Sequence, residues 1–309
     1  MSAHRLPSSA WRVALVGYGE VGRILAEDLR AQGLCVQAHD ARPTDAMLAH
    51  ARGLGVDWAP DPARAMAGAQ LVISAVTASQ TLAVAQACAP ALVLGSFVLD
   101  LNSASPLAKQ QAAACVDSAG GRYVEGAVMT SVPPYRSRVP LLLGGPHAQA
   151  LCEPLNALGF AARVASERLG VASATKMCRS VMIKGLEAMV IESLSAARHY
   201  GVEDAVIASL QETFPGIAWE QQAAYFFQRV IEHGRRRSEE VQEVARTVQE
   251  AGLTPWSAAG TAQRQAWVAD LADAGVFGAR GSPGFARSPD WRTEADRLLA
   301  ASALHKESP

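Results

Sequence analysis

The chain lacks any Cys-x-x-Cys motif, and its five cysteines are scattered. An odd number of cysteines cannot all be joined within one chain, which argues against a disulfide framework. The seven histidines do not cluster, so no zinc-ligand spacing is present and we expect no metal site. We therefore expect free thiols in a reducing cytoplasm, at Cys35, Cys88, Cys115, Cys152 and Cys178.

A strong excess of either charge is also missing. Charged residues make up 18% of the 309 residues, and the formal net charge is −1. This balance argues against the basic surface that nucleic-acid binding requires. Hydrophobic residues make up 50%, enough for a large buried core. The length accommodates two ordinary domains, so we expect a globular two-domain protein whose partner is a small molecule.

No segment has the pattern of a signal peptide or a membrane span. Residues 1–11 are polar and lack the apolar core of a signal peptide. No charged residue occurs between Arg64 and Asp100, but polar residues interrupt that stretch. It is better explained as a buried strand, a short helix and another buried strand, the pattern of a parallel sheet covered on both faces. We therefore expect no membrane partner.

The first half of the chain alternates between strand and helix patterns. Residues 12–16 are a short apolar run, a glycine-rich turn and a helical pattern follow, and residues 34–39 form a second strand that ends in Asp40. The alternation continues to a strand at 161–164. Strands that alternate with helices predict a doubly wound, mostly parallel sheet of the Rossmann type. We assign residues 1–168 to this dinucleotide-binding domain.

The second half has a helical pattern. A long helix is expected over 171–200, and glycine and proline separate the later segments. A loop rich in glycine, arginine and proline covers 278–289. Residues 169–309 are therefore predicted to form an all-α domain, with its later helices at 203–213, 217–232, 235–251, 257–274 and 291–304.

The glycine-rich turn has the Gly-x-Gly-x-x-Gly spacing of a dinucleotide site. Gly17 would allow the tight turn, Gly19 would let a pyrophosphate approach the backbone, and Gly22 would let the helix pack closely on the sheet. A helix N-terminus offers N–H groups and partial positive charge to phosphates. The alternative is a glycine-rich turn that binds nothing.

Asp40 and Arg42 bear on the choice of dinucleotide. Asp40 ends the second strand, where a carboxylate accepts hydrogen bonds from the adenosine ribose and repels a 2′-phosphate. This favours NAD, whereas Arg42 could hold that phosphate and leaves NADP open. The expected cofactor contacts are Gly17, Tyr18, Gly19, Glu20, Val21, Gly22, Asp40, Arg42, Val76 and Thr77.

The long helix carries polar side chains on a largely apolar surface. At 100° per residue, Ser180 lies about 40° and Glu187 about 20° from Lys176 around the helix. A charged group on such a face requires a partner or a function. We expect Glu187 and Glu192 to be structural partners of Lys184 or Arg198.

Four segments, in order, resemble a known family. They are the glycine turn, the segment Asp-Leu-Asn-Ser-Ala-Ser-Pro at 100–106, the segments 123–131 and 141–145, and residues 170–180, which match Gly-x-Gly-x-x-x-Lys-x-x-Asn-Asn in part. The chain resembles the β-hydroxyacid dehydrogenases, relatives of 3-hydroxyisobutyrate and 6-phosphogluconate dehydrogenases. Residues 176–185 and 233–237 are similar to an uncharacterised bacterial subgroup with a C-terminal domain of unknown function.

The chain departs from the family pattern near the substrate. Ala172 replaces the second glycine, and Arg179 and Ser180 replace the paired asparagines. Residues 129–131 are Met-Thr-Ser, where the family has Ser-Gly-Gly. The resemblance therefore supports fold and reaction class better than it supports a substrate.

The resemblance implies an oxidoreductase that transfers hydride between NAD(P) and a 3-hydroxy acid or a related β-hydroxy compound. Lys176 would exchange a proton with the substrate hydroxyl, and Ser180 would replace the amide that holds the substrate oxygen. The family also implies a homodimer formed through the helical domain. The expected substrate contacts are Asn102, Ser103, Met129, Thr130, Ser131, Arg179 and His233.

Plainer interpretations remain open for several of these residues. Lys176 could be a solvated helix lysine, Ser180 could bond back to a carbonyl of its own helix, and Asn102 and Ser103 could be turn formers. The segment 233–237, His-Gly-Arg-Arg-Arg, could be a solvated basic turn after a helix that ends at Gly234, or an anion site. For the whole chain, the alternatives are an imine reductase, which Lys176 argues against, and a non-catalytic dinucleotide sensor.

Overall fold

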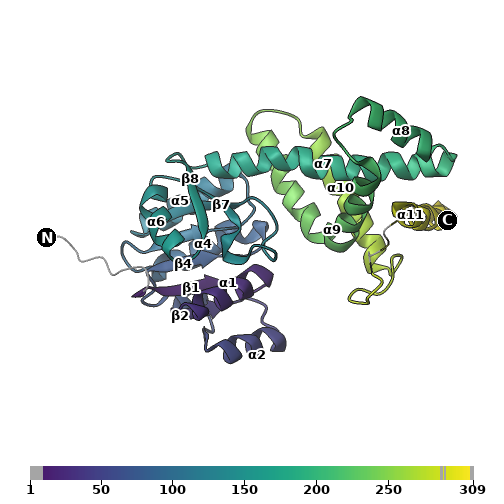
Figure 1. Ribbon diagram of the computed structural model, residues 1–309. Helices are drawn as coiled ribbons and strands as arrows, with labels where there is room; N and C mark the ends of the chain where they lie inside the picture. The colour runs from purple at the N-terminus through teal and green to yellow at the C-terminus, as the bar shows by residue number, and fades with distance from the viewer. Residues whose placement is uncertain (1–9, 286–287, 289, 307–309) are drawn as a thin grey trace. The chain divides into compact units, whose positions relative to one another are not determined.

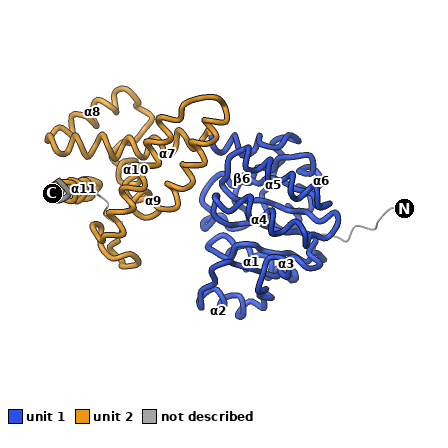
Figure 2. Tube along the Cα trace, turned by 180° about the vertical axis from the view of Figure 1, so that it is seen from behind, with its two compact units in different colours: residues 1–177 blue, residues 178–309 orange. Residues whose placement is uncertain are grey.

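The computed structural model describes residues 10–285, 288 and 290–306. Within this part, the chain forms two compact units, Met1–Met177 and Cys178–Pro309 (Figure 2). The polar segment 1–9 and parts of the predicted loop 278–289 lie outside the described residues. Each unit is described by itself below.

Unit 1 is built on a single mixed sheet (Figure 1). Among the described residues the sheet has eight strands in the order β3-β2-β1-β4-β5-β6-β7-β8. Neighbouring strands are parallel except β6 and β7, which are antiparallel. This confirms the predicted doubly wound, mostly parallel sheet. The strands are β1 (Arg12–Val16), β2 (Cys35–His39), β3 (Asp57–Trp58), β4 (Leu71–Ser74), β5 (Phe97–Asp100), β6 (Arg122–Val128), β7 (Pro140–Gly144) and β8 (Ala161–Ser166).

Helices cover both faces of this sheet (Figure 1). Because successive strand residues point to opposite faces, Val13 and Leu15 of β1 enter one core and Ala14 and Val16 enter the other. The first core includes side chains of α1 (Glu20–Ala31), α2 (Asp45–Leu54) and α6 (Ala148–Ala157). The second includes side chains of α3 (Pro62–Met66), α4 (Thr81–Cys88) and α5 (Pro106–Ser118). This double cover explains why the central strands are almost entirely apolar.

The uncharged stretch between Arg64 and Asp100 forms β4, α4 and β5, as predicted. Its polar residues lie mainly in the connections and in the short helix, and its apolar runs are the buried strands. In the part of the chain that the structure describes, no helix has the length and apolarity needed to cross a bilayer.

The strand order changes direction at β1. The chain runs from β1 outward through β2 to β3, and then returns to place β4 on the other side of β1. Hydrogen bonds continue past the strand ends there, from Gly17 N to His39 O (2.9 Å) and from Ala75 N to Val16 O (2.8 Å). In doubly wound sheets, ligands bind at this switch point, outside the carboxyl ends of the strands. The fold thus locates the candidate site between the ends of β1 and β4.

Unit 2 is helical in its described residues. Helix α7 (Val171–Tyr200) starts in unit 1 and continues into unit 2, where α8 (Glu203–Thr213), α9 (Trp219–Glu250), α10 (Trp256–Asp273) and α11 (Trp291–Lys306) follow. Their core contains Trp219, Phe226, Phe227 and Trp291. Tyr225, the neighbour of Phe226 in the sequence, is half exposed. The predicted all-α domain is confirmed.

Helix α9 corrects one prediction. Residues 217–232 and 235–251 were expected to be two helices separated at Gly234, but α9 runs through this position without a break. A Cβ on Gly234 would lie 2.8 Å from Gln265 O and 3.3 Å from Ala269 Cβ, both in α10. The glycine therefore permits close packing of two helices, and it does not end one.

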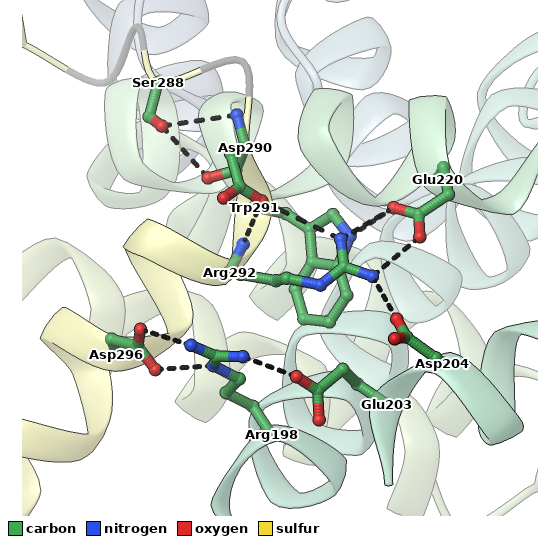
Figure 3. Close-up of polar contacts among 9 residues, drawn as sticks. All are labelled: Arg198, Glu203, Asp204, Glu220, Ser288, Asp290, Trp291, Arg292 and Asp296. Carbon is green, nitrogen blue, oxygen red and sulfur yellow. Dashed lines mark hydrogen bonds and ion pairs between the residues drawn. The ribbon is translucent and has the colours of Figure 1, made fainter. Parts of the chain in front are cut away.

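Ion pairs attach α11 to the other helices of unit 2 (Figure 3). Arg292 binds Asp204 of α8 at 2.6 Å and Glu220 of α9 at 2.8 Å. Arg198 of α7 binds Asp296 at 2.8 Å and also binds Glu203 (Figure 3). These pairs fix the last helix on three elements at once.

The expected partners within α7 are wrong. Glu187 pairs with Arg237 of α9, and Lys184 pairs with Glu240 of α9 at 2.6 Å. Burial lowers the pKa of Lys184, an effect that the Glu240 carboxylate opposes. Glu192 binds Arg264 of α10 at 2.6 Å. These carboxylates are structural, as expected, but they join different helices and not neighbouring turns of one.

Glu187→Ala is expected to lower the free energy of unfolding by about 3–5 kcal/mol, because it leaves the buried Arg237 guanidinium without its carboxylate. Denaturant unfolding measures this change. Glu192→Ala is the matched control, since the exposed pair with Arg264 contributes about 0–1 kcal/mol. Equal losses in the two variants would contradict the assignment.

Candidate active site

The glycine turn after β1 is closed by the protein's own backbone at two positions. Gly17 has a φ of +96°, and a Cβ there would lie 2.5 Å from Ala75 O. A Cβ on Gly22 would lie 2.2 Å from Gly17 O. Gly22 therefore lets α1 pack against the glycine turn. The expected role was close packing of α1 on the sheet, but the atom nearest to a Cβ at this position belongs to the turn. Neither position can accept a side chain without a shift of backbone.

Gly19 differs from the other two glycines. It caps the N-terminus of α1 with a φ of −68°, which any residue can adopt. A Cβ there would meet no described atom within 4 Å. The protein's own packing therefore does not explain this glycine, whereas a ligand that approaches the backbone does. Glu20 and Val21 form the first turn of α1, whose N-terminus suits a pyrophosphate.

Asp40 supports the same turn from the end of β2. Its Oδ2 accepts a hydrogen bond from Tyr18 N at 2.8 Å, and its Oδ1 accepts one from Arg42 N at 2.9 Å. A carboxylate has further lone pairs, so Asp40 can also accept a ribose hydroxyl. Arg42 is exposed beside it. The glycines, the helix N-terminus and Asp40 together fit a dinucleotide.

The Tyr18 side chain points into the core. It is fully buried, packs edge-on against Trp58 with ring centroids 5.4 Å apart, and its hydroxyl lies 3.2 Å from Nδ1 of His50. Burial, followed by the charge of Glu27, raises the pKa of Tyr18 to about 12. The phenol therefore stays neutral, and the side chain of Tyr18 serves the core and is not exposed to a cofactor.

Asn102 links the ends of two neighbouring strands. Its Oδ1 accepts from Val76 N at 2.8 Å, and its Nδ2 donates to Ser74 Oγ at 2.9 Å. Asn102 is 4% exposed, so little of it is accessible to a ligand. Asn102 thus shapes the segment that carries Val76 and the exposed Thr77. This role lies closer to the turn-forming alternative than to direct substrate contact.

Lys176 and Ser103 meet at the carboxyl edge of the sheet. Lys176 Nζ donates a hydrogen bond to Ser103 Oγ at 2.6 Å, and both side chains are partly buried. Ser103 lies just after β5, whereas Lys176 is 73 residues later, in the part of α7 that belongs to unit 1. The structure thus brings together two residues that the sequence had proposed separately.

Two buried networks behind this pair were missed from the sequence. Lys109 Nζ binds Asp100 Oδ1 at 2.8 Å, and the Tyr123 hydroxyl donates to Asp100 Oδ2 at 2.6 Å. Burial, followed by the charge of Asp100, raises the pKa of Tyr123 well above its ordinary value. The sequence signal for this network was a single charged residue, Asp100, at the end of an apolar strand. These contacts fix the end of β5, from which Ser103 follows.

The second network centres on Glu125 of β6, whose side chain is fully buried. Oε1 accepts hydrogen bonds from Gly170 N (2.8 Å) and Ala172 N (3.1 Å). Oε2 accepts hydrogen bonds from Ser173 Oγ (2.7 Å) and Ser173 N (3.3 Å). Glu125 therefore holds the start of α7 against the sheet. A lone carboxylate within an apolar strand was the signal that could have identified it.

The connection from β6 to β7 carries the other expected substrate contacts. Met129 is partly buried, and its N–H donates to Pro140 O at 3.0 Å, whereas Thr130 and Ser131 are exposed. Farther along, Arg136 has a φ of 57° and binds Asp28 of α1 at 2.7 Å.

Arg136 also binds Glu27 of α1 at 2.7 Å, and Ser137 N donates to Asp28 Oδ2 at 2.9 Å. Hydrogen bonds from Arg136 and His50 lower the pKa of Glu27. The connection from β6 to β7 is therefore attached to α1, the helix that follows the glycine turn.

The remaining candidates belong to unit 2. Ser180 is buried and Arg179 is exposed. His233 is partly buried, with its Nε2 3.7 Å from Glu232 Oε2, and burial lowers its pKa. Unit 1 by itself assembles the group around Lys176 and Ser103, and the roles expected of these three residues stay predictions.

The arginines after His233 have carboxylate partners. Arg235 binds Asp270 and Asp273, Arg236 binds Glu240, and Arg237 binds Glu187. The segment is the middle of α9, so the expected basic turn is wrong. The pairing leaves the alternative, an anion site, without support.

Comparisons with known proteins agree with this geometry. The NAD binding domain of 6-phosphogluconate dehydrogenase matches residues 12–151, and a domain of unknown function (DUF1932) matches residues 197–268. The chain is 37% identical to a conserved hypothetical protein from Sinorhizobium meliloti 1021. That likeness covers 94% of this chain and 96% of the other, with a TM-score of 0.74. The chain belongs to this 6-phosphogluconate dehydrogenase-like family with a DUF1932 domain.

The chain is also similar to a protein of Methanothermus fervidus. An uncharacterised 28.5 kDa protein of Methanothermus fervidus is 28% identical over 251 residues, which cover 79% of this chain and 93% of that protein. The two domain matches, at residues 12–151 and 197–268, confirm the predicted resemblance to the family.

More distant structures share the fold. A 3-hydroxyisobutyrate dehydrogenase from Mycobacterium tuberculosis, solved with L-serine, is 16% identical, covers 94% of this chain and 99% of its own, and has a TM-score of 0.67. An imine reductase from Streptomyces aurantiacus is 18% identical, covers 93% and 99%, and has a TM-score of 0.53. Family and fold together support an NAD(P)-dependent oxidoreductase with a nicotinamide dinucleotide as cofactor.

Proposed function

We propose that this member of the family transfers hydride between NAD(P) and a 3-hydroxy acid or a related β-hydroxy compound, with Lys176 as the general acid and base. The hydrogen bond of 2.6 Å between Lys176 Nζ and Ser103 Oγ carries the proposal. It puts an amine and a hydroxyl at the carboxyl edge of the sheet, where such folds bind ligands. The shared fold with a 3-hydroxyisobutyrate dehydrogenase supports the substrate class.

The dinucleotide, when bound, supplies the hydride acceptor or donor. Lys176 takes the proton from the substrate hydroxyl during oxidation and returns it during reduction. Ser103 orients the amine and offers its own oxygen to the substrate. The exposed Thr130 and Ser131 bind the polar end of the substrate. The roles expected of Ser180, Arg179 and His233 remain predictions, and so does the substrate contact expected of Met129.

We propose NAD as the preferred dinucleotide. The Asp40 carboxylate lies at the end of β2, next to the glycine turn, where its charge opposes a 2′-phosphate. Arg42 is the group that would favour NADP, and its side chain is exposed.

A cofactor-reduction screen tests the proposal. A panel of 3-hydroxy acids and of aryl and sugar-derived β-hydroxy compounds is offered with NAD and NADP in parallel, and the reverse reaction is run with a cyclic imine. We expect turnover with 3-hydroxy acids and a higher kcat/KM with NAD. Turnover of the imine alone would identify an imine reductase, and dinucleotide binding without turnover of any compound would favour a sensor.

The oligomeric state and the location of the protein also belong to this proposal. Met182 and Met189 of α7 are 70% and 61% exposed, which supports an apolar contact between two copies. We propose a homodimer formed through the helical domain, and a single-copy mass in light scattering would refute it. The expected cytoplasmic location stays a prediction.

A further inference from the structure

We propose that Glu125 is a positioning residue that sets the reach of Lys176 toward Ser103. This inference rests on the proposed role of Lys176. The hydrogen bonds of Glu125 described above all go to the start of α7, so Glu125 acts on Lys176 through that turn. The contacts, the strand register and the shape of the surrounding backbone each support this role.

The buried Glu125 carboxylate and the start of α7 stabilise each other. A carboxylate that is fully excluded from water is destabilising unless hydrogen bonds compensate it. Backbone N–H groups at a helix N-terminus do so well, because they are otherwise unpaired and the helix dipole adds positive charge there. Each Glu125 oxygen accepts from this turn, which fixes the turn in both position and rotation.

The strands β5 and β6 position both residues of the contact between Lys176 and Ser103. Asp100 of β5 and Glu125 of β6 are register partners in the sheet. Ser103 follows Asp100 by three residues, and Lys176 follows Ser173 by three residues, or about one helical turn. The path from Ser103 through β5, β6, Glu125 and α7 to Lys176 is therefore short and built from regular elements.

The backbone around Glu125 leaves room for the carboxylate in one place. Gly144 of β7 is its register partner on the other side, and a Cβ on Gly144 would lie 2.3 Å from Glu125 Oε1. Gly170, whose N–H donates to Oε1, has a φ of +91°, a value that favours glycine. Gly144 thus leaves the space that the Glu125 carboxylate occupies, and Gly170 lets the backbone turn so that its N–H faces Oε1.

Site-resolved acylation of lysines tests the proposal without using activity. The chain has lysines at positions 109, 176, 184 and 306, so mass spectrometry can follow each one separately. In Glu125→Gln one carboxylate oxygen becomes an NH2 group, which cannot accept from the two groups that donate to that oxygen, so the turn loses part of its anchor. We expect acylation of Lys176 to become severalfold faster, whereas Lys184, paired with Glu240, keeps its rate.

Kinetics supply the second readout. Displacement of a catalytic group by about 1 Å lowers rates by about 100-fold, so kcat should fall by about that factor in Glu125→Gln. The KM for the dinucleotide should not change, because Glu125 does not contact the glycine turn. Glu125→Asp, which keeps the charge but is one methylene shorter, should restore part of kcat.

Glu153→Gln is the matched control, since Glu153 is exposed on α6 of the same unit and the charge change is identical. Where Glu125→Gln does not fold, Ser173→Ala removes one donor to Oε2 and should give a smaller increase in Lys176 acylation. An unchanged Lys176 rate in the folded variant overturns the inference. Activity retained by Lys176→Ala would instead overturn the proposed function and leave the acylation result standing as evidence on position alone.

Discussion

Lys176→Ala is expected to lower kcat by about 10²- to 10⁴-fold, the range of a general acid or base, while the Kd of the dinucleotide changes little. The amine that contacts Ser103 is lost, whereas the glycine turn and Asp40 are untouched. Steady-state kinetics with the best substrate of the screen, and titration of NADH fluorescence, measure the two quantities. Full activity in this variant would reject the proposed role.

Lys176→Arg separates proton transfer from charge. The guanidinium keeps a positive charge and can donate to Ser103, but it does not release a proton near neutral pH. We therefore expect it to be nearly as inactive as the alanine variant. An active arginine variant would show that the residue serves as a fixed charge, in contradiction of the general acid and base role.

Gly19→Val is expected to weaken dinucleotide binding by about 100-fold, or about 2.7 kcal/mol, with a nearly unchanged melting temperature. The reason is the contrast among the three glycines. A Cβ at Gly19 would meet no described atom within 4 Å, so the protein leaves open the place where a pyrophosphate would approach. Calorimetric titration with NAD and thermal unfolding of the free protein measure the two effects.

Gly22→Ala should behave in the opposite way. Its methyl group would lie 2.2 Å from Gly17 O, so the free protein should unfold at a lower temperature. If Gly19→Val binds NAD as tightly as the original protein, the turn is not a phosphate site, and the dinucleotide assignment of this turn is wrong.

Local signals in the sequence were sufficient for most of the fold. The glycine turn, the strand that ends in Asp40 and the buried strands around the uncharged stretch predicted the sheet. Helices α7 and α8 lie where the pattern predicted them, at 171–200 and 203–213. Breakers such as Gly201, with a φ of +67°, act within their own segment and can be recognised without a partner.

Gly234 shows where local signals fail. A glycine followed by three arginines has the composition of a helix end, but its φ does not lie in the left-handed region, and α10 packs on it closely. The partner that explains the glycine is about thirty residues away in the sequence. For the same reason Lys184 and Glu187, three residues apart, were expected to pair with neighbours on their own helix. Both pair with α9 instead.

The sequence predicted the residues of the candidate site but not the buried residues that hold them in position. Lys176 and Ser103 were both named from the sequence, through the resemblance of their segments. Glu125 and Lys109 were not, because the partners of each belong to another element, at the start of α7 for Glu125 and at the end of β5 for Lys109. A charged residue inside an apolar strand indicates that a partner exists, but the sequence does not say which element supplies it.

The attachment of the β6–β7 connection to α1 has a consequence for how this protein can diverge. The backbone is tied at Met129 to Pro140, and again at Arg136 and Ser137 to Asp28. The stretch 130–135 between these ties is short and exposed except for the buried Val132, and it lies outside the strands of the sheet. The exposed positions of this stretch can therefore change while the nucleotide half keeps its shape, and under the proposed function this makes them the natural place to begin altering the choice of substrate in the laboratory.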